Sequence, residues 1–380
     1  MKPRLLYRRK RRKGNIVVLT AFLMVALMAL LAFAIDIGYI MAVKTEMQRT
    51  ADAAAIAAAW ELLDENLQTG TSSGTLSTNA RSEAQLFTGY NKVRNASLSL
   101  SSDDVLIGHR DNPFNTALPI QTASSCPLNT VRVRVQHTAM QNGEVPLFFA
   151  RVLGYNSQSL QEDATAALLT SFGGFKTPSD GSNLEILPFA LDKETWDDLL
   201  DGAACDNWTW DSECKHVECG SDGILEVNLY PQGTGSPGNR GTIDIGSSSN
   251  STNDIKRQIL DGISDEDMEH HNGVLEFNDD GELYLNGDTG ISAGFKAQLE
   301  EIKGEPRIIP IFQQVEGNGN NAEYTIVCWA GVRIMEVKLT GSNNQKRVIV
   351  QPCNITVRGG IPSTSTSSSY FMYSPVILVE

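Results

Sequence analysis

Hydrophobic residues are concentrated in one uninterrupted run near the start of the chain. Residues 16–35 contain no charged residue, no proline and no glycine. Twenty residues of α-helix rise about 30 Å, which is the thickness of the hydrocarbon core of a bilayer. The pattern therefore predicts a single-pass transmembrane helix over residues 16–38, which makes the lipid bilayer the first expected partner.

A second helical pattern follows this run directly. Met47, Ala51, Ala54, Ala58 and Leu62 recur at spacings of three and four, which is the periodicity of one helix face. The alanine-rich block has high helix propensity, and no proline or glycine interrupts the chain from residue 39 to residue 68. We therefore expect the transmembrane helix to continue outside the membrane, where its small residues pack on its own domain or against a partner helix.

Six residues of this helix are candidates for the membrane boundary and for helix docking. The set comprises Asp36, Gly38, Ala51, Asp52, Ala54 and Ala58. Asp36 stands at the outer edge of the apolar run, where a charge is tolerated far better than at the bilayer centre. It is interpreted as marking the end of the span, and the alternative is a pair with a cationic group of a partner subunit.

Shorter patterns after the helix predict a small α+β unit over residues 39–170. Alternation of apolar and polar residues predicts strands at residues 96–100 and 131–135, and another strand is expected over 159–168. Residues 145–153 predict a short amphipathic helix that is closed by Gly154.

The rest of the chain predicts a β-rich domain over residues 183–360. Residues 171–182 have the composition of a linker, and residues 361–380 form a Ser/Thr-rich tail that we expect to be mobile. A hairpin is predicted from the strands 274–277 and 282–285. Further strands are predicted at 307–312, 324–330, 332–339 and 347–350, with helices at 253–262 and 293–302. The expected fold class is α+β: a transmembrane helix extended into an alanine-rich helix packed on a small sheet, then a β-rich exported domain.

Charge sets the expected orientation of the chain. Eight Lys and Arg residues lie in the basic segment 1–15, and the remainder of the chain carries a net charge of about −22 by subtraction. Basic flanks stay in the cytoplasm, so the C-terminal region is predicted to be periplasmic or extracellular. An acidic exported region argues against nucleic-acid binding. A cleaved signal peptide is the alternative, but its apolar core is normally about 7–15 residues long and ends at small residues.

Six cysteines, an even number, all follow the predicted span. They are Cys126, Cys205, Cys214, Cys219, Cys328 and Cys353. In an oxidising compartment this pattern favours disulfides, and the sequence leaves their pairing open. Cys214, His216 and Cys219 also offer zinc-type ligands, although the spacing from Cys205 fits a four-ligand site poorly.

The sequence predicts a protein without enzymatic activity and without a cofactor. It contains no Gly-x-Ser-x-Gly, His-Glu-x-x-His or phosphate-loop motif. The turn from Glu276 to Gly281 begins like a calcium loop, but the twelfth position is Gly287, where a bidentate glutamate belongs. A hairpin turn explains the same residues, and weak calcium binding stays an alternative.

Residues 12–170 resemble a known family. Residues 12–15, 34–39 and 48–57, together with 143–170, are similar to the TadE/TadG type of Tad (tight adherence) or Flp pilus-assembly proteins. The resemblance implies a component of Tad/Flp pilus assembly or surface adherence in the inner membrane of a bacterium. Its implied partners are other membrane proteins of that machine.

One position separates this chain from a pilin precursor. Pilins and pseudopilins carry a glutamate five residues after the processing glycine, and here the residue at that distance from Gly14 is Leu19. The resemblance is therefore closer to TadG-like proteins, which keep their anchor. The alternative function is a surface adhesin or ligand-binding module that uses the same anchor independently of pili. The oligomeric state is left open by the sequence.

Overall fold

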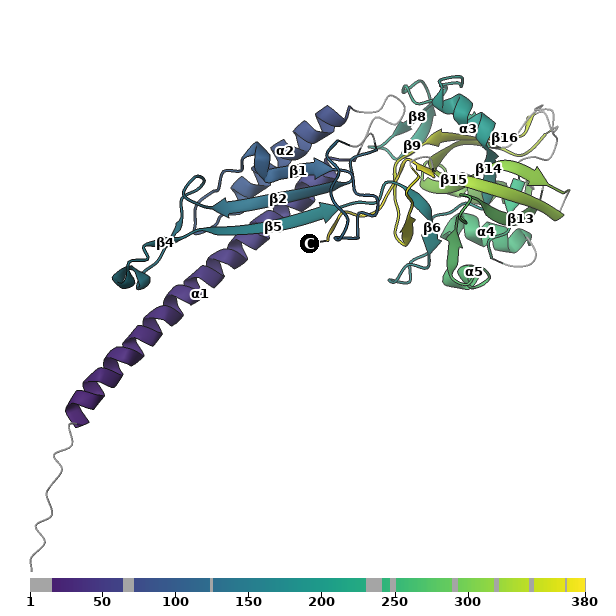
Figure 1. Ribbon diagram of the computed structural model, residues 1–380. Helices are drawn as coiled ribbons and strands as arrows, with labels where there is room; N and C mark the ends of the chain where they lie inside the picture. Colours follow the sequence, from purple (N-terminus) through teal and green to yellow (C-terminus); the bar gives the residue numbers. More distant parts are fainter. Residues whose placement is uncertain are drawn as a thin grey trace, which may run out of the picture.

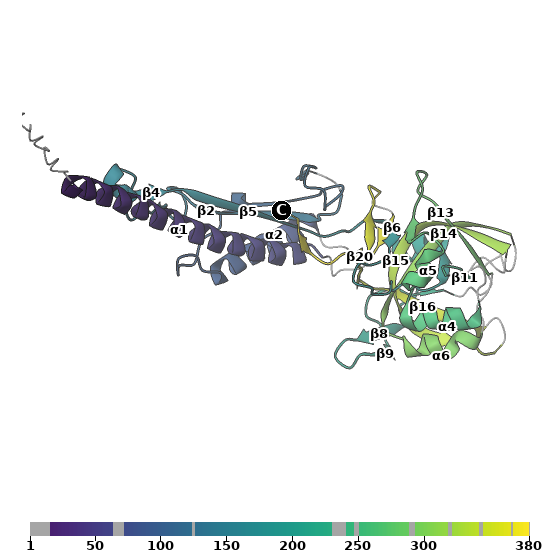
Figure 2. The same cartoon turned by 90° about the horizontal axis from the view of Figure 1, so that it is seen from below.

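The molecule is elongated, with a long helix projecting from one end and a β-rich body at the other (Figures 1 and 2). The computed structural model describes residues 16–63, 72–123, 126–229, 241–246, 251–288, 293–317, 321–341, 345–365 and 368–379. The basic segment 1–15, which includes Gly14, lies outside the described residues.

The first helix, α1, is continuous from Ile16 to Trp60, a length of 45 residues. At 1.5 Å per residue it is about 68 Å long. The apolar side chains of its first half are largely exposed, whereas Val43, Met47 and a series of alanines are buried in its second half. The predicted extension of the apolar helix into an alanine-rich helix is therefore confirmed.

The second half of α1 packs on a four-stranded antiparallel sheet in the order β1-β2-β5-β21. These strands span Val105–Gly108, Thr130–His137, Leu160–Ala167 and Ile377–Leu378. The second helix, α2 (Ser73–Tyr90), lies beside α1. Alternate residues of β2, namely Val131, Val133 and Val135, are buried in the core shared with the helices. We call α1 from residue 39 onward, α2 and this sheet the helix–sheet module.

Two predicted elements of the helix–sheet module are wrong. Residues 96–100 form no strand, and Leu98 and Leu100 are buried in the core from an irregular segment. Residues 145–153 form a two-residue strand β3 (Val145–Pro146) and a 3₁₀ turn η2 (Ala150–Leu153) instead of a helix. Gly154 ends η2 with a left-handed conformation, as its predicted closing role requires. The short strand β4 (Ser157–Gln158) pairs with β3, and η1 (Ser102–Asp104) precedes β1.

The body is built around a sheet that closes on itself. Strand β15 pairs with β13 on one side and with β14 on the other, and the path continues through β7 and β11 back to β13. These strands are β7 (Phe189–Asp192), β11 (Gly241–Ile243), β13 (Leu283–Asp288), β14 (Pro306–Glu316) and β15 (Ala322–Lys338). β16 (Arg347–Pro352) and β10 (Val227–Asn228) extend the sheet beyond β15.

Helices cover the body and short strands complete it. The helices are α3 (Lys193–Leu200), α4 (Thr252–Asp261), α5 (Asp265–Glu269), η3 (Ala293–Phe295) and α6 (Lys296–Glu301). The short strands are β6 (Phe172–Lys176), β8 (Trp208–Asp211), β9 (His216–Cys219), β12 (Val274–Glu276), β17 (Ile355–Thr356), β18 (Gly360–Pro362), β19 (Ser369–Tyr370) and β20 (Met372–Tyr373). Two apolar clusters form the core of the body.

Most predicted elements of the body are present, but their pairing differs from the prediction. The two strands predicted at 324–330 and 332–339 are one bent strand, β15, and the helices predicted at 253–262 and 293–302 correspond to α4 and to η3 with α6. β12 and β13 form no hairpin with each other, because β12 pairs with β6 and β13 pairs with β15.

The predicted linker and tail both contain ordered strands. Part of the segment 171–182 is β6, in which Phe172 and Phe175 are fully buried, so burial of two aromatic rings outweighs the linker-like glycines between them. The tail returns to the helix–sheet module, where Ile377 and Leu378 of β21 pair with Ala167 and Ala166. The C-terminus consequently lies beside β5 rather than at the far end of the body (Figure 1).

Candidate functional site

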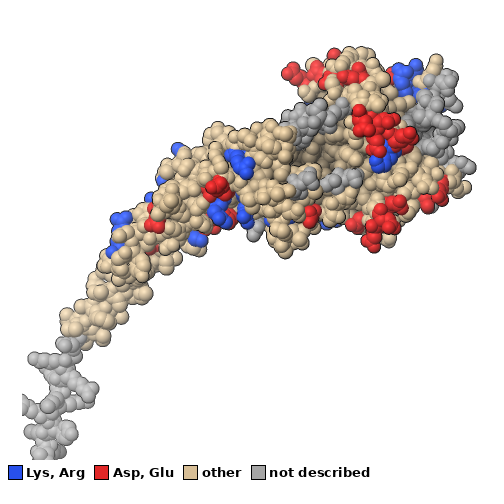
Figure 3. All heavy atoms as spheres, turned by 45° about the horizontal axis from the view of Figure 1, so that its top comes forward, with Lys and Arg blue, Asp and Glu red and all other residues tan. Residues whose placement is uncertain are grey.

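The apolar half of α1 is a bare surface. Among the described residues, α1 is the one helix that is long and apolar enough to cross a membrane. Its apolar side chains are largely exposed, for example Val17 at 81% and Phe22 at 75%. In the space-filling view this end shows no charged side chain, whereas acidic side chains gather on the body (Figure 3). Apolar surface of this extent marks a membrane or protein contact.

Asp36 stands where the exposed half of α1 meets the rest of the chain. Its side chain is 3% exposed, and its two carboxylate oxygens accept hydrogen bonds from three consecutive backbone N–H groups. The distances are 2.8 Å from Phe148 N, 3.0 Å from Phe149 N and 2.7 Å from Ala150 N. Asp36 therefore satisfies the donors at the start of η2 in the way that a capping carboxylate satisfies the first turn of a helix.

We call residues 147–156, between β3 and β4, the docking loop. Its ends are joined by the hydrogen bond from Leu147 N to Asn156 O, at 3.0 Å. The ring of Phe148 packs edge-on against Tyr39 of α1, with the ring centroids 5.1 Å apart. The docking loop is thus fixed to α1 by a polar contact at Asp36 and by an aromatic contact one turn further on.

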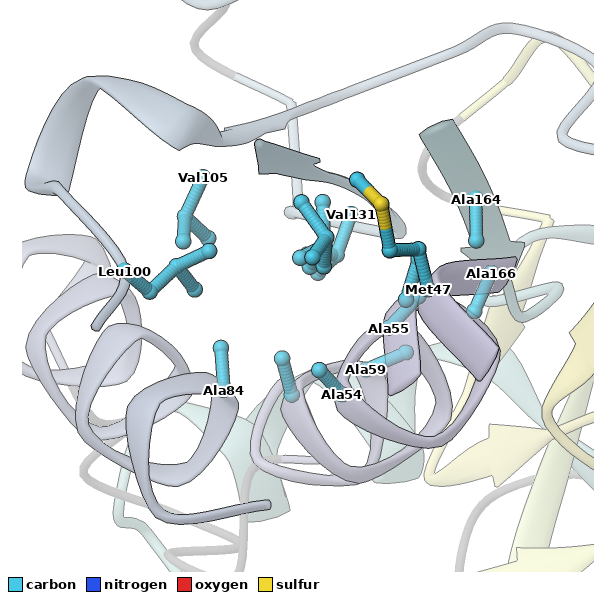
Figure 4. Packing of buried hydrophobic residues seen from close by; sticks show 14 of the residues in the cluster. Met47, Ala54, Ala55, Ala59, Ala84, Leu100, Val105, Val131, Ala164 and Ala166 are labelled. Carbon is cyan, nitrogen blue, oxygen red and sulfur yellow. The ribbon is translucent and has the colours of Figure 1, made fainter. Parts of the chain in front are cut away.

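The alanines of α1 form the contact between this helix and the module. Ala51, Ala54, Ala55, Ala58 and Ala59 are fully buried. Figure 4 shows alanines of α1 and Ala84 of α2 facing Val105 and Val131 of the sheet. Small side chains allow the helix backbones to approach the sheet and each other closely. The alanine face is therefore occupied within this chain, as the first of the two predicted roles requires.

Gly38 and Asp52 lie outside this buried face. Gly38 is exposed, and a Cβ added to it meets no atom within 4 Å among the described residues. The side chain of Asp52 is half-buried and accepts a hydrogen bond from Gln48 Nε2 at 2.8 Å. Gly38 is thus placed on a face where another backbone has room to approach.

Polar contacts fasten the same stretch of α1 to the segment after α2. Glu46 accepts a hydrogen bond from the backbone N–H of Arg94 at 2.7 Å, and Arg94 Nε donates to the hydroxyl of Tyr39 at 2.8 Å. Thr50 Oγ1 donates to the carbonyl of Asn91 at 3.1 Å. On the sheet side, Lys44 forms an ion pair with Glu162 of β5 at 2.8 Å. These contacts hold the helix in one orientation on the module.

Two family models match the part of the chain that contains this arrangement. The Tad family model, described as Flp pilus-assembly TadE/G-like, matches residues 14–61, and the Tad_C model, described as Tad-like Flp pilus-assembly, matches residues 44–166. Residues 14–166 belong to the Tad/Flp pilus-assembly family. No curated protein and no solved structure matches the chain.

The Tad match follows the structure closely. Its first part covers α1, and its second part runs from the buried half of α1 through α2, β1 and β2 to β5. Asp36 lies within the first match, and the docking loop lies within the second. The closed sheet of the body and the returning strand β21 lie outside both matches.

The predicted disulfides are absent from the structure. All six cysteines lie in the described residues, and no two of them are bonded to each other. In the backbone pairing, Cys219 lies opposite Trp208 in the hairpin β8–β9, and Cys205 lies opposite Glu226 in an isolated β-bridge. Cys328 is buried in β15, and burial raises the pKa of its thiol to about 12. That thiol therefore stays protonated and unreactive.

At the first of the two candidate metal sites of the body, the structure brings three possible ligands close together. Asp211, Cys214 and His216 have their ligand atoms within 4.8 Å of one another, but Asp211 accepts hydrogen bonds from the N–H groups of Glu213 and Cys214 within the turn. Hydrogen bonding to Asp211 and the negative charge of that carboxylate raise the pKa of the Cys214 thiol, which disfavours the thiolate that zinc prefers.

At the second candidate, the calcium-like turn, Asn278 Oδ1 accepts the N–H groups of Asp280 and Glu282, both at 3.0 Å. One of the oxygens that a cation would use is thus engaged in shaping the turn. The hairpin-turn interpretation of these residues survives only in part, since the flanking strands pair elsewhere.

Two features of this site are missing from the sequence-based picture. The contact between Asp36 and the docking loop joins residues more than a hundred positions apart, and neither proposed role for Asp36 included it. One signal pointed toward this contact: Asp36 and residues 143–154 both belong to the segments that resemble the family. The return of β21 to β5 rests on two apolar residues, for which the sequence shows no comparable signal.

Proposed function

We propose that this chain is a single-pass inner-membrane component of Tad/Flp pilus assembly that acts through non-covalent contacts. Its N-terminus would lie in the cytoplasm, with the helix–sheet module and the body exported. The basic segment before the span supports this orientation, because short basic flanks remain in the cytoplasm. Within the family we place it with the TadG-like proteins, because Leu19 replaces the glutamate of pilin precursors.

The observation that carries this proposal is that the family match includes α1, whose apolar side chains are exposed in its first half and buried in its second half. The match covers residues 14–166, and the exposed apolar half of α1 lies inside it. The same helix that would cross the membrane is the central element of the module's core. The span therefore supports the module directly, and the body is carried at the end opposite to it (Figure 2).

The proposed contacts with other pilus components use the surfaces that this chain leaves open. Gly38 and the exposed apolar side chains of α1 offer a face for another helix within the membrane. Outside it, the acidic body offers a surface suited to partners with basic patches. Neither surface requires a catalytic group.

The test is deletion of the gene followed by complementation with the full-length, tagged chain. We expect pili to be lost on deletion and restored by the full chain, and other pilus-assembly proteins to co-purify after mild detergent extraction. A matched control replaces residues 16–35 with the transmembrane helix of an unrelated single-pass protein. Unchanged piliation on deletion, together with purification of the chain alone, would overturn the proposal.

A further inference from the structure

The docking loop exposes a group of large apolar side chains. Val152 is 88% exposed, Tyr155 67%, Leu153 60% and Phe148 57%. All of them lie on one short segment that is fixed to α1. A monomeric protein facing water rarely concentrates so many exposed apolar side chains in eight residues.

The docking loop lies along the apolar half of α1 rather than beyond its end. A groove of about 340 Å³ separates the two segments, with Val25, Met28 and Phe33 on the helix side and Val152 and Leu153 on the loop side. Figures 1 and 2 both show the loop next to β4 lying beside this part of the helix. The loop therefore occupies the same level as residues predicted to be in the membrane.

The depth of the loop follows from the helix rise. Met28 and Val25 precede Asp36 by eight and eleven residues, which places them about 12 and 16 Å along the helix axis from Asp36. The hydrocarbon core is about 30 Å thick, so a loop that reaches this level enters the outer leaflet when α1 spans the bilayer.

The backbone of the docking loop is suited to such an environment. Irregular backbone within lipid is costly unless its polar groups are satisfied inside the protein. The N–H groups of residues 148–150 donate to Asp36. Val152 N donates to Phe149 O at 3.1 Å, Gly154 N to Arg151 O at 3.0 Å and Tyr155 N to Ala150 O at 3.1 Å. Asp36 thus removes three donors that lipid could not satisfy.

We infer that the docking loop inserts into the outer leaflet of the bilayer as a second membrane contact beside α1. Its occupant is lipid: acyl chains cover Val152 and Leu153 and fill the groove against Val25 and Met28. Arg151 is exposed and carries the one charge of the loop. Its long side chain extends toward the headgroup phosphates, as cationic side chains do at membrane interfaces. Two contacts fix the rotation and tilt of the helix–sheet module, which one helix alone leaves free.

This inference rests on the proposed membrane anchoring of α1, and its test separates the two. The photo-cross-linking amino acid p-benzoylphenylalanine replaces Val152 in the full-length chain, expressed in its native membrane with other pilus components present. Two matched variants carry the same probe at Phe22, in the predicted span, and at Tyr284, which is half-exposed on β13 of the body. After irradiation, mass spectrometry distinguishes phospholipid adducts from protein adducts.

We expect phospholipid adducts at positions 152 and 22, each several-fold more abundant than at position 284. Protein adducts in place of lipid at position 152 would overturn the inference, because a partner helix would then fill the groove. Lipid adducts at 22 without lipid adducts at 152 would overturn it and leave the anchor intact. Absence of lipid adducts at both positions would overturn the anchor and the inference together.

Discussion

Asp36 connects two segments of the chain that the sequence keeps 112 to 114 residues apart. One carboxylate accepts three N–H groups, so the conformation of the docking loop depends on a side chain of α1. A sequence pattern shows that a charge ends an apolar run, but it does not show which distant donors that charge meets. For this reason the sequence left two roles open for Asp36: marking the end of the membrane span, or pairing with a cationic group of a partner subunit.

Substitution of Asp36 by alanine is expected to free the docking loop. Three backbone N–H groups would lose their acceptor, and the start of η2 would open because nothing else in the described residues replaces the carboxylate. Hydrogen exchange of the amides at 148–150 should become much faster, and Asp36→Asn should show a smaller effect because one amide oxygen can still accept. Asp52→Asn on the same helix serves as the control, since Asp52 accepts from a single side chain. Unchanged protection in Asp36→Ala would show that the loop is held by its other contacts.

His271 is a second residue whose surroundings have a measurable consequence. Burial at the end of α5 lowers the pKa of its imidazole, opposed by a hydrogen bond to the carbonyl of Ile245 and by the charge of Asp244, while neighbouring His270 lowers it further. The unfolded chain, with a histidine pKa of about 6.5, binds this proton more readily than the folded chain. The contribution of neutral His271 to folding stability is therefore complete above a pH of about 6.5. It is lost as the pH falls toward the lowered pKa of His271 in the folded chain.

Thermal unfolding of the full-length protein should therefore show a decrease in Tm between about pH 7 and pH 5 that His271→Gln reduces. His270→Gln is the matched control, because His270 is exposed and contributes the smallest of the four effects on His271. An identical pH profile for the wild type and His271→Gln would show that other groups account for the acid sensitivity.

At the scale of elements, helices and strands with a pattern that extends over many residues were predictable. Strand pairings that depend on only a few residues were not predictable. The helix α1 could be predicted because its apolar run and its alanine face extend over 45 residues without proline. β2 was equally clear, since its alternating valines face the helices. The segment 145–153 has the composition of an amphipathic helix, but Val145 and Pro146 pair with β4, and the 3₁₀ turn that follows ends at Gly154 after four residues. β12 and β13 were paired wrongly because their true partners, β6 and β15, are remote in sequence.

The alanine face of α1 should tolerate no larger side chain. Ala55 is fully buried between α1, α2 and the sheet, so Ala55→Leu would force the helix away from its neighbours. Overpacking of this kind typically destabilises a protein by about 1–3 kcal/mol. Ala42→Leu on the exposed side of the same helix is the control, with an expected change within about 0.5 kcal/mol. Both are compared by thermal unfolding, and equal effects of the two substitutions would contradict the packing described.

At the scale of the whole molecule, the chain passes between the module and the body twice, and Phe114, which lies between β1 and β2, also packs against the core of the body. The chain passes from β5 to β6 once, and it returns through β20 to β21, which pairs with β5. Val379 N adds a hydrogen bond to Thr165 O at 2.9 Å, and Tyr373 and Val376 pack on the core of the module. The last residues therefore close a ring that includes both units, which a Ser/Thr-rich composition did not predict.

Deletion of residues 376–380 should loosen this second connection without unfolding either unit. We expect small-angle scattering of the detergent-solubilised protein to show a broader distribution of distances, because fewer contacts would then hold the body to the module. The full-length variant Ile377→Thr, Leu378→Thr keeps the backbone pairing of β21 and should show a smaller change. A scattering profile unaltered by the deletion would mean that β21 does not restrain the body.

The unbroken length of α1 has a further consequence for how the exported region meets its surroundings. From Asp36 to Trp60 the helix rises about 36 Å with no hinge, and its side chains are packed along most of that distance. A domain on a flexible linker samples many heights above a membrane. The effective concentration of its binding surface at a fixed partner is therefore low. Here the height is a property of the helix itself. The rigid helix thus holds a binding surface on the body at a constant distance from the bilayer.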